Sequence, residues 1–164
     1  MSTTATPAFT VSLEPPRQPA VEAMLGAGAA FAQSLYPPES NFLLDVSELE
    51  APGVRFYVAR DAAGEAIGTA ALVADAARPA RAELKRMYVE PSARRLGVAR
   101  GLLEHLEADA AAHGIHEIVL ETGDLHTAAQ ALYERAGYRP IPQFGQYVGE
   151  AHSVCFAKAV SPER

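Results

Sequence analysis

The chain has 164 residues, of which 49% are hydrophobic, so it is able to bury a core and is not a disordered chain. Its 14 basic and 20 acidic residues give a net charge of −6. This balance argues against a general nucleic-acid or membrane-surface binder, since either needs a basic face, and it is compatible with a cationic substrate.

Hydrophobic patterning predicts strands and helices along the chain. Residues 9–14 alternate apolar and polar side chains and are predicted as a strand, which the prolines at 15, 16 and 19 close. The further predicted strands are 54–61, 66–75, 81–90, 116–123 and 153–160. The predicted helices are 20–36, one turn before Pro52, 97–112 and 127–137. Residues 138–150 are broken by proline and glycine and are predicted as a loop.

The order of these segments predicts the class of fold. A meander of three strands over 54–90, followed by two helix–strand alternations, implies a mixed sheet with helices on its faces. This is an α/β fold, classed as α+β in some schemes. No internal repeat or linker interrupts the sequence, so residues 1–164 are expected to form a single domain.

The helix at 97–112 begins in an unusual way. The stretch RRLGVARGLLEHL, residues 94–106, places positive charge and bare backbone at the helix start. The first N–H groups of a helix have no partner within it, and small residues at Gly97 and Ala99 allow a ligand to approach them. Arg94 and Arg95 are able to donate charge-assisted hydrogen bonds to phosphate oxygens. The stretch therefore predicts a site for a phosphate-bearing ligand, and the alternative is a tight, solvated loop.

Two motifs extend this interpretation to a family. Arg94-x-x-Gly97-x-Ala99, preceded by AELKRMYVEP, resembles the acetyl-CoA pyrophosphate loop of the GNAT superfamily of N-acetyltransferases, with the pattern Gln/Arg-x-x-Gly-x-Gly/Ala. The segment LETG…TAAQALYERAGYRPI resembles the closing strand, helix and turn of the same family, and the resemblance covers residues 54–160. YPPESNFLLD and FGQY…SVCF further resemble a bacterial subgroup of these acetyltransferases.

The resemblance implies a fold and a coenzyme site. The fold is a mixed central sheet of six to seven strands flanked by about four helices, in which the strands at 81–90 and 116–123 splay apart around the thioester of acetyl-CoA. The backbone of Met87, Tyr88 and Val89 would bind the pantetheine arm and the acetyl carbonyl. The residues expected to hold the pyrophosphate are Arg94, Arg95, Leu96, Gly97, Val98, Ala99 and Arg100.

The resemblance also implies two catalytic residues. Tyr133 matches the family tyrosine that faces the coenzyme sulfur, and a phenol is able to donate a proton to a departing thiolate. Glu83 matches a catalytic glutamate of the family's histone-acetylating branch and is the candidate base. Tyr133 is alternatively a core aromatic of its helix. Glu83 is alternatively a solvated charge or a partner of Lys85 or Arg86, with a chain of water molecules as the base.

The acceptor is expected to be a primary amine of a small molecule or a protein. The residues expected to line its pocket are Tyr36, Glu39, Ser40, Glu121 and Tyr147. An acetyl-CoA-binding regulatory module without turnover is the alternative function, and Tyr133 and Glu83 favour the enzyme. A P-loop is excluded because no Lys-Ser/Thr follows the glycine, and a dinucleotide-binding Rossmann site because the three-glycine fingerprint is missing.

Other sequence features bear on metals, compartment and assembly. Cys155 is the only cysteine, so no intrachain disulfide or cysteine-built zinc site forms, and strand alternation predicts it in the core. The histidines show no metal-ligand spacing, and no metal is expected. The sequence shows no signal peptide and no membrane-spanning stretch, which predicts a cytoplasmic protein. A homodimer that pairs residues 156–160 across a two-fold axis is a possible assembly.

Overall fold

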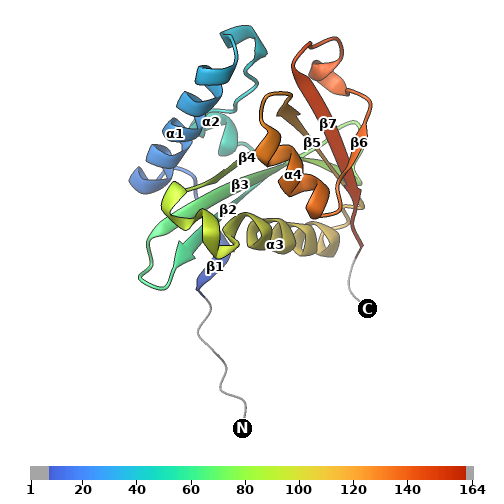
Figure 1. Ribbon diagram of the computed structural model, residues 1–164. Helices are drawn as coiled ribbons and strands as arrows, with labels where there is room; N and C mark the ends of the chain where they lie inside the picture. The colour runs from blue at the N-terminus through green and yellow to red at the C-terminus, as the bar shows by residue number, and fades with distance from the viewer. Residues whose placement is uncertain (1–7, 162–164) are drawn as a thin grey trace.

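A seven-stranded mixed sheet crosses the molecule in the order β1-β2-β3-β4-β5-β7-β6 (Figure 1). The structure, a computed structural model, describes residues 8–161 apart from the side chain of Arg95. The strands are β1 (Phe9–Leu13), β2 (Val54–Asp61), β3 (Ala66–Ala74), β4 (Arg81–Val89), β5 (Glu117–Gly123), β6 (Arg139–Ile141) and β7 (Ser153–Ala159). The helices are α1 (Pro19–Leu35), α2 (Val46–Leu49), α3 (Val98–Ala112) and α4 (Thr127–Arg135), with 3-10 turns at Pro38–Ser40, Pro91–Leu96 and Gly145–Tyr147.

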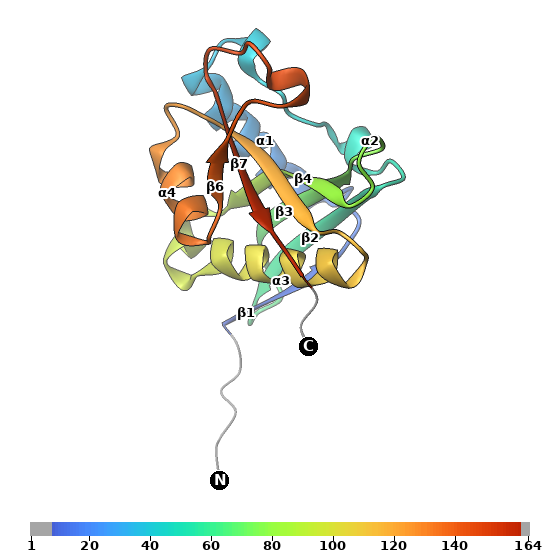
Figure 2. The same cartoon turned by 90° about the vertical axis from the view of Figure 1, so that its right-hand side faces the viewer.

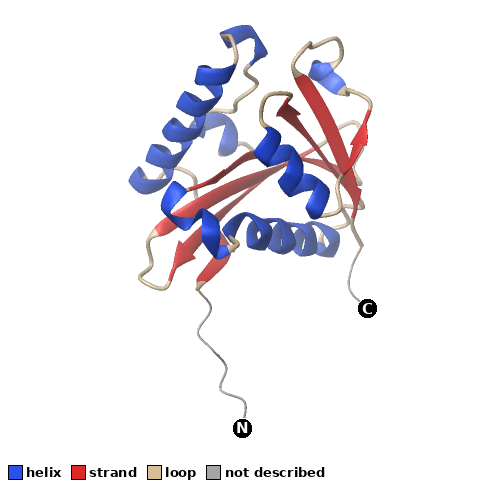
Figure 3. Cartoon of the chain, viewed as in Figure 1, coloured by secondary structure: helices blue, strands red, loops and turns tan. Residues whose placement is uncertain are grey.

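The helices cover both faces of the sheet (Figures 2 and 3). Side chains of α1 and α2, such as Met24 and Leu49, pack in one cluster with Phe56 and Val58 of β2. Those of α3 and α4 pack in a second cluster on the opposite face. Strand β2 contributes alternate residues to the two clusters, since successive side chains of a strand point to opposite faces. Its uninterrupted apolar run is explained by this burial on both faces.

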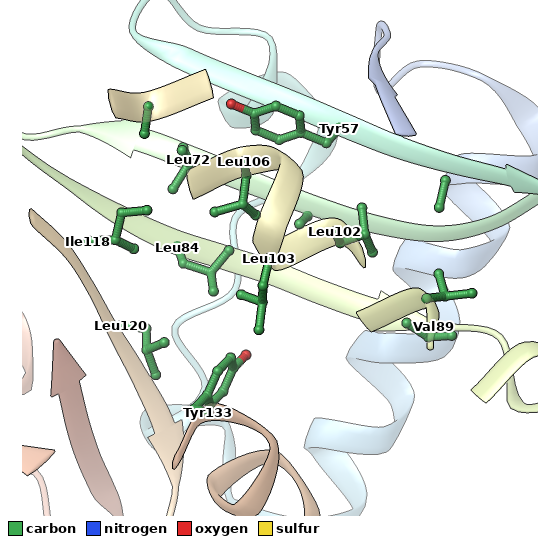
Figure 4. Close-up of a cluster of buried hydrophobic side chains, with 14 of the residues drawn as sticks. Tyr57, Leu72, Leu84, Val89, Leu102, Leu103, Leu106, Ile118, Leu120 and Tyr133 are labelled. Atoms are coloured by element: carbon green, nitrogen blue, oxygen red, sulfur yellow. The ribbon is translucent and has the colours of Figure 1, made fainter. Parts of the chain in front are cut away.

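Helix α3 supplies the centre of the second cluster. Its apolar stripe at helical spacing is fully buried and lies over β2, β3 and β4, where Leu102, Leu103 and Leu106 pack in one cluster with Leu72 and Leu84 (Figure 4). This packing also holds the first turn of α3 near the end of β4, because only Glu90, the Pro91–Leu96 turn and Gly97 separate the two elements. The core therefore positions the predicted anion site.

The predicted strands and helices are confirmed, and the predicted loop at 138–150 is wrong. It contains the strand β6 and the Gly145–Tyr147 turn. Strand β6 pairs with β7 through Arg139↔Ala157 and Ile141↔Cys155. Pro140 is tolerated because β6 is an edge strand, where an N–H group is not needed on the outer side. Cys155 is buried in the core, as predicted.

The placement of β6 also bears on the predicted dimer contact. Strand β7 lies between β5 and β6, so the outer edge of Phe156 and Ala157 is already paired with β6. In the predicted pairing segment, 156–160, only residues 158–160 are not paired with β6. Phe156 and Ala157 thus already have a partner on both sides within the chain, and the homodimer stays a prediction.

A charged network joins α3 to β2. Asp109 of α3 accepts hydrogen bonds from Nε and a terminal nitrogen of Arg55, at 2.8 and 3.0 Å, and from the hydroxyl of Tyr57 at 2.5 Å. Burial raises the pKa of Asp109, but these hydrogen bonds outweigh it, so that its pKa lies below the ordinary value. The folded state therefore holds Asp109 as the carboxylate.

We expect Asp109→Ala to lower the free energy of unfolding at neutral pH by about 3 kcal/mol, because Arg55 and Tyr57 lose their shared acceptor. Since the folded pKa is depressed, this stabilisation is complete above the ordinary pKa of aspartate and is lost as pH falls through the folded value. Urea unfolding of both proteins across pH measures this difference. A difference that stays constant down to strongly acidic pH would contradict the assignment.

Within residues 8–161, no helix combines the length and the apolar character needed to cross a membrane.

Candidate functional site

The central feature of the site is the divergence of β4 and β5. Their parallel ladder runs from Arg81↔Glu117 to Leu84↔Leu120 and ends there. Strand β4 continues to Val89 beside β3, and β5 continues to Gly123 beside β7. A cleft of about 540 Å³ lies at this divergence, and we call it the main cleft. The inner edge of β4 is therefore unpaired with β5 beyond Leu84, which leaves backbone groups for a ligand.

A β-bulge lies in β4 where it leaves β5. In the pairing with β3, Ala71 faces Lys85 whereas Thr69 faces Tyr88, so β4 carries one extra residue. Arg86, in the bulge, has a φ of 57°, and within residues 8–161 it is the one non-glycine residue with a positive φ. The Thr69 hydroxyl donates to the Arg86 carbonyl at 3.0 Å and holds this conformation. The bulge redirects the end of β4, where Met87, Tyr88 and Val89 all line the main cleft.

The predicted anion site lies at the start of α3. This helix has no side-chain cap and no acidic residue in its first turn. Gly97 precedes it with a φ of 76°, a conformation that favours glycine, and a Cβ there would meet nothing within 4 Å. Arg94 and Ala99 line the main cleft, and Arg94 Nε donates to the Val89 carbonyl at 3.2 Å. The site therefore combines open space, unpartnered helical N–H groups and a nearby cation.

Other members of the predicted coenzyme loop lie beside the main cleft. The residues that do not line it are Leu96, Gly97, Val98 and Arg100. The side chain of Val98 is fully buried, so that only its backbone is available to a ligand. Arg100 is exposed and pairs with Glu104 at 3.1 Å. Toward a ligand, this part of the loop therefore offers backbone rather than side-chain contacts.

Tyr133 lies on the wall of the main cleft. It is buried, and its ring packs at 5.8 Å from Tyr138 and 6.4 Å from Phe156. Its hydroxyl makes no hydrogen bond within the described residues, and the ring lies in the core cluster of Figure 4. Burial raises the pKa of Tyr133, with a smaller contribution from the negative charge of Glu121. The phenol is thus protonated and has a proton to donate.

Glu83 and Tyr147, predicted for different roles, form one cluster on the main cleft. The Tyr147 hydroxyl donates to Glu83 Oε2 at 2.5 Å. Lys85 Nζ lies 3.5 Å from the same carboxylate oxygen, and it donates to the Tyr147 hydroxyl at 2.7 Å and the Phe42 carbonyl at 3.1 Å. Glu83 therefore lines the cleft and has the partner Lys85 that its alternative interpretation required.

Glu121 is a second carboxylate on the main cleft. Burial raises its pKa, an effect that a hydrogen bond of 2.6 Å from the Ser153 hydroxyl partly offsets. The positive charge of Lys85 also lowers this pKa, whereas the negative charge of Glu83 raises it. Two carboxylates and one ammonium thus share one wall, and together they favour a cationic group in the cleft.

The segment after α1 closes one side of the main cleft. Tyr36 and Ser40, both predicted for the acceptor pocket, line this cleft. The Tyr36 hydroxyl accepts a hydrogen bond of 2.7 Å from the Leu125 N–H, and its ring lies where a side chain at residue 123 would stand. Gly123 is thus required for this close approach. Glu39, predicted for the same pocket, is exposed in the Pro38–Ser40 turn and is not among the residues that line the cleft.

Several residues of the main cleft were not among the predicted site residues. Lys85 stands two residues from Glu83, and strand alternation was a signal for their common face. His126 caps α4 by accepting from the Ala129 N–H at 3.1 Å, and it lines the cleft. Phe42 and Arg86 gave no comparable signal, because a loop and a bulge place them. Within residues 8–161, no three His, Cys, Asp or Glu side chains lie together in a way that would hold a metal ion.

Comparison with known proteins gives a consistent result. The model of the acetyltransferase (GNAT) family matches residues 22–138. The chain is 38% identical to the IAA acetyltransferase of Azospirillum brasilense over 141 residues, which cover 86% of this chain and 91% of that protein. It is 32% identical over 148 residues to the uncharacterized N-acetyltransferase YedL of Escherichia coli, covering 88% and 91% of the two chains.

Solved structures show the same similarity. One from Klebsiella pneumoniae, named for acyl-CoA N-acyltransferase activity, superposes with a TM-score of 0.81 at 30% identity and covers 94% of this chain and 99% of that chain. An aminoglycoside 6'-N-acetyltransferase complexed with coenzyme A has a TM-score of 0.66 at 19% identity, covering 94% and 99%. The second likeness concerns the fold alone, and both structures share the fold of this chain.

Proposed function

Because this chain belongs to the acetyltransferase (GNAT) family and is an acyltransferase, we propose that it transfers an acetyl group from acetyl-CoA directly to a primary amine within one ternary complex. The observation that carries this proposal is the composition of the main cleft. One cleft is lined by Arg94 and Ala99 of the anion site, by the buried phenol of Tyr133, and by the carboxylates of Glu83 and Glu121. Donor and acceptor would thus meet in one cavity, and their approximation lowers the barrier.

The residues around the divergence of β4 and β5 fit acetyl-CoA. Its pyrophosphate would bind the backbone N–H groups of residues 95–100 and the guanidinium of Arg94. Its pantetheine arm would lie along the unpaired edge of β4 at Met87, Tyr88 and Val89, all of which line the main cleft. When bound, the coenzyme supplies an acetyl thioester. A backbone N–H of β4 would polarise the thioester carbonyl, as oxyanion-hole donors do.

Tyr133 is the proposed acid. Its hydroxyl is free of protein partners among the described residues, and burial holds its pKa above the ordinary value, so the proton is present at neutral pH. The phenol would donate this proton to the coenzyme sulfur as the thiol departs. The apolar surroundings of Tyr133 strengthen this hydrogen bond, since water does not compete for it.

Glu83 is the proposed base. The acceptor amine must lose its proton before it attacks, and Glu83 would take that proton directly or through water. The Tyr147 hydroxyl and Lys85 hold the Glu83 carboxylate in place on the cleft wall. Glu121, with Tyr36 and Ser40, would bind the acceptor on the same side, where the half-buried carboxylate would attract a cationic amine.

Two measurements on the purified protein test the proposal. Calorimetric titration with acetyl-CoA is expected to give a dissociation constant on the order of micromolar. Release of free thiol in the presence of a panel of primary amines is then expected to exceed the release without amine. No binding of acetyl-CoA would refute the proposal. Binding without amine-dependent release from any member of the panel would instead favour a regulatory coenzyme sensor.

A further inference from the structure

Arg86 is half-buried and forms no ion pair in the described part of the chain, whereas every other arginine whose side chain the structure describes is either paired with a carboxylate or exposed. Carboxylate oxygens lie within 3.2 Å of the guanidinium groups of Arg17, Arg55, Arg60, Arg81 and Arg100. Arg86 has one side-chain hydrogen bond within the described residues, a donation of 2.7 Å to the carbonyl of Leu25 in α1. Burial lowers its pKa, and no carboxylate within residues 8–161 forms an ion pair with it. A partly buried cation without a counter-charge is unfavourable, and a bound anion would relieve it.

The bulge in β4 directs the side chain of Arg86 toward α1. Leu84 and Met87 both contact the core beneath α3. In a regular strand Arg86 would point to the same face as Leu84 and would enter that core. The extra residue instead sends Lys85 and Arg86 to the opposite side, where they reach the carbonyls of Phe42 and Leu25. A non-glycine residue at a φ of 57° is strained. In this strained conformation the guanidinium of Arg86 points toward α1.

Arg86 lies at the junction of two cavities. The main cleft is one of them. The other, about 530 Å³, lies between α1 and residues 38–46, and we call it the side cavity. Arg86, Asn41 and Leu43 line both. A molecule whose amine lies in the main cleft could therefore extend past the segment 41–43 and bring a second group to the guanidinium.

The guanidinium determines the chemistry of that second group. An arginine has five N–H donors in a planar fork that suits a carboxylate or a phosphate, and Leu25 occupies only part of it. Glu22 and Asp45 also line the side cavity, and their negative charges disfavour a doubly charged group. The combination of one available guanidinium and two nearby carboxylates favours a singly charged carboxylate over a phosphate.

We propose that Arg86 binds a carboxylate of the acceptor, so that the acceptor is a primary amine that also carries a carboxylate, an amino acid in the broad chemical sense. This assignment rests on the proposed acetyl transfer, since it supposes that the amine occupies the main cleft. The acidic wall of Glu83 and Glu121 would bind the ammonium end, and Arg86 would bind the opposite end. Amines of the same shape without a carboxylate would be weaker acceptors.

The test compares matched ligands on the protein saturated with coenzyme A. Calorimetric titrations use ω-amino acids of increasing chain length against alkylamines of equal length, and phenylalanine against phenethylamine. At least one amino acid is expected to bind about tenfold or more tightly than its matched amine, the effect of a charge-assisted hydrogen-bonded pair. Arg86→Gln is expected to abolish this difference, and Arg86→Lys to retain part of it. The matched control is Arg135→Gln, on an exposed position of α4 outside both cavities.

Each outcome decides for or against Arg86. No preference of the wild-type protein for any amino acid would overturn the proposal, whether or not the variants fold. A preference that survives in Arg86→Gln would also overturn it, as would binding of inorganic phosphate, but of no amino acid, that depends on Arg86. Coenzyme A affinity and the urea midpoint confirm that the variants are folded. Since titration requires no turnover, preference without acetylation would refute the proposed reaction alone, and acetylation without preference would refute the role of Arg86 alone.

Discussion

Replacing Tyr133 with phenylalanine is expected to lower kcat by about a hundredfold, within the range for loss of a general acid. The thiolate of coenzyme A would then depart without a proton in a site that excludes water, where a bare charge is costly. The dissociation constant for acetyl-CoA is expected to stay within about threefold of the wild type, because the phenol contributes to the departing group rather than to coenzyme binding. Steady-state kinetics with a saturating amine, together with calorimetry, measure the two quantities.

Tyr138→Phe provides the matched control for this substitution. Tyr138 is also buried and packs against Tyr133, but it lies outside the main cleft, and its hydroxyl donates to Glu107 at 3.0 Å. Loss of that bond affects stability and leaves kcat unchanged. If Tyr133→Phe lowers kcat by no more than Tyr138→Phe does, Tyr133 is the core aromatic of the alternative interpretation.

A Glu83→Gln variant with a small effect on kcat would indicate that a chain of water molecules serves as the base.

The double variant Arg94→Ala, Gly97→Glu is expected to weaken acetyl-CoA binding by at least about a hundredfold. It removes one cation from the anion site and places a carboxylate beside the helical N–H groups that the pyrophosphate would use. The space above Gly97 is open, with nothing within 4 Å of a Cβ, so the new side chain is able to occupy it. Calorimetric titration with acetyl-CoA measures the loss.

The control variant Gly64→Glu distinguishes this loss of acetyl-CoA affinity from an effect of backbone strain. Gly64 lies in the turn between β2 and β3 with a φ of 84°, and a Cβ there also meets nothing within 4 Å. Gly64→Glu therefore introduces the same charge at a similar conformation, away from α3, and acetyl-CoA should bind it as it binds the wild type. Equal affinity of the double variant and the wild type would remove the start of α3 from the coenzyme site.

The sequence alone predicted most of the elements and the family. Helix α3 could be predicted because its apolar residues recur at the period of a helix. The strands could be predicted because their apolar runs are bounded by turn residues. The stretch Arg94–Arg100 was readable because the chemistry of a helix N-terminus is local: charge, small residues and free N–H groups lie within a few positions. Local patterns of this kind depend on neighbours in the chain, and a sequence contains them directly.

Only the tertiary structure decided how the site is assembled. Strand β6 exists because β7 offers it a partner, against the local preference of a proline-rich segment. The hydrogen bond between Tyr147 and Glu83 joins residues 64 positions apart, and the exposed place of Glu39 depends on how the segment after α1 folds over the cleft. The direction of Arg86 depends on a bulge that Thr69 of the neighbouring strand holds. Contacts between distant segments determine these features, and no local pattern in the sequence specifies which segments will meet.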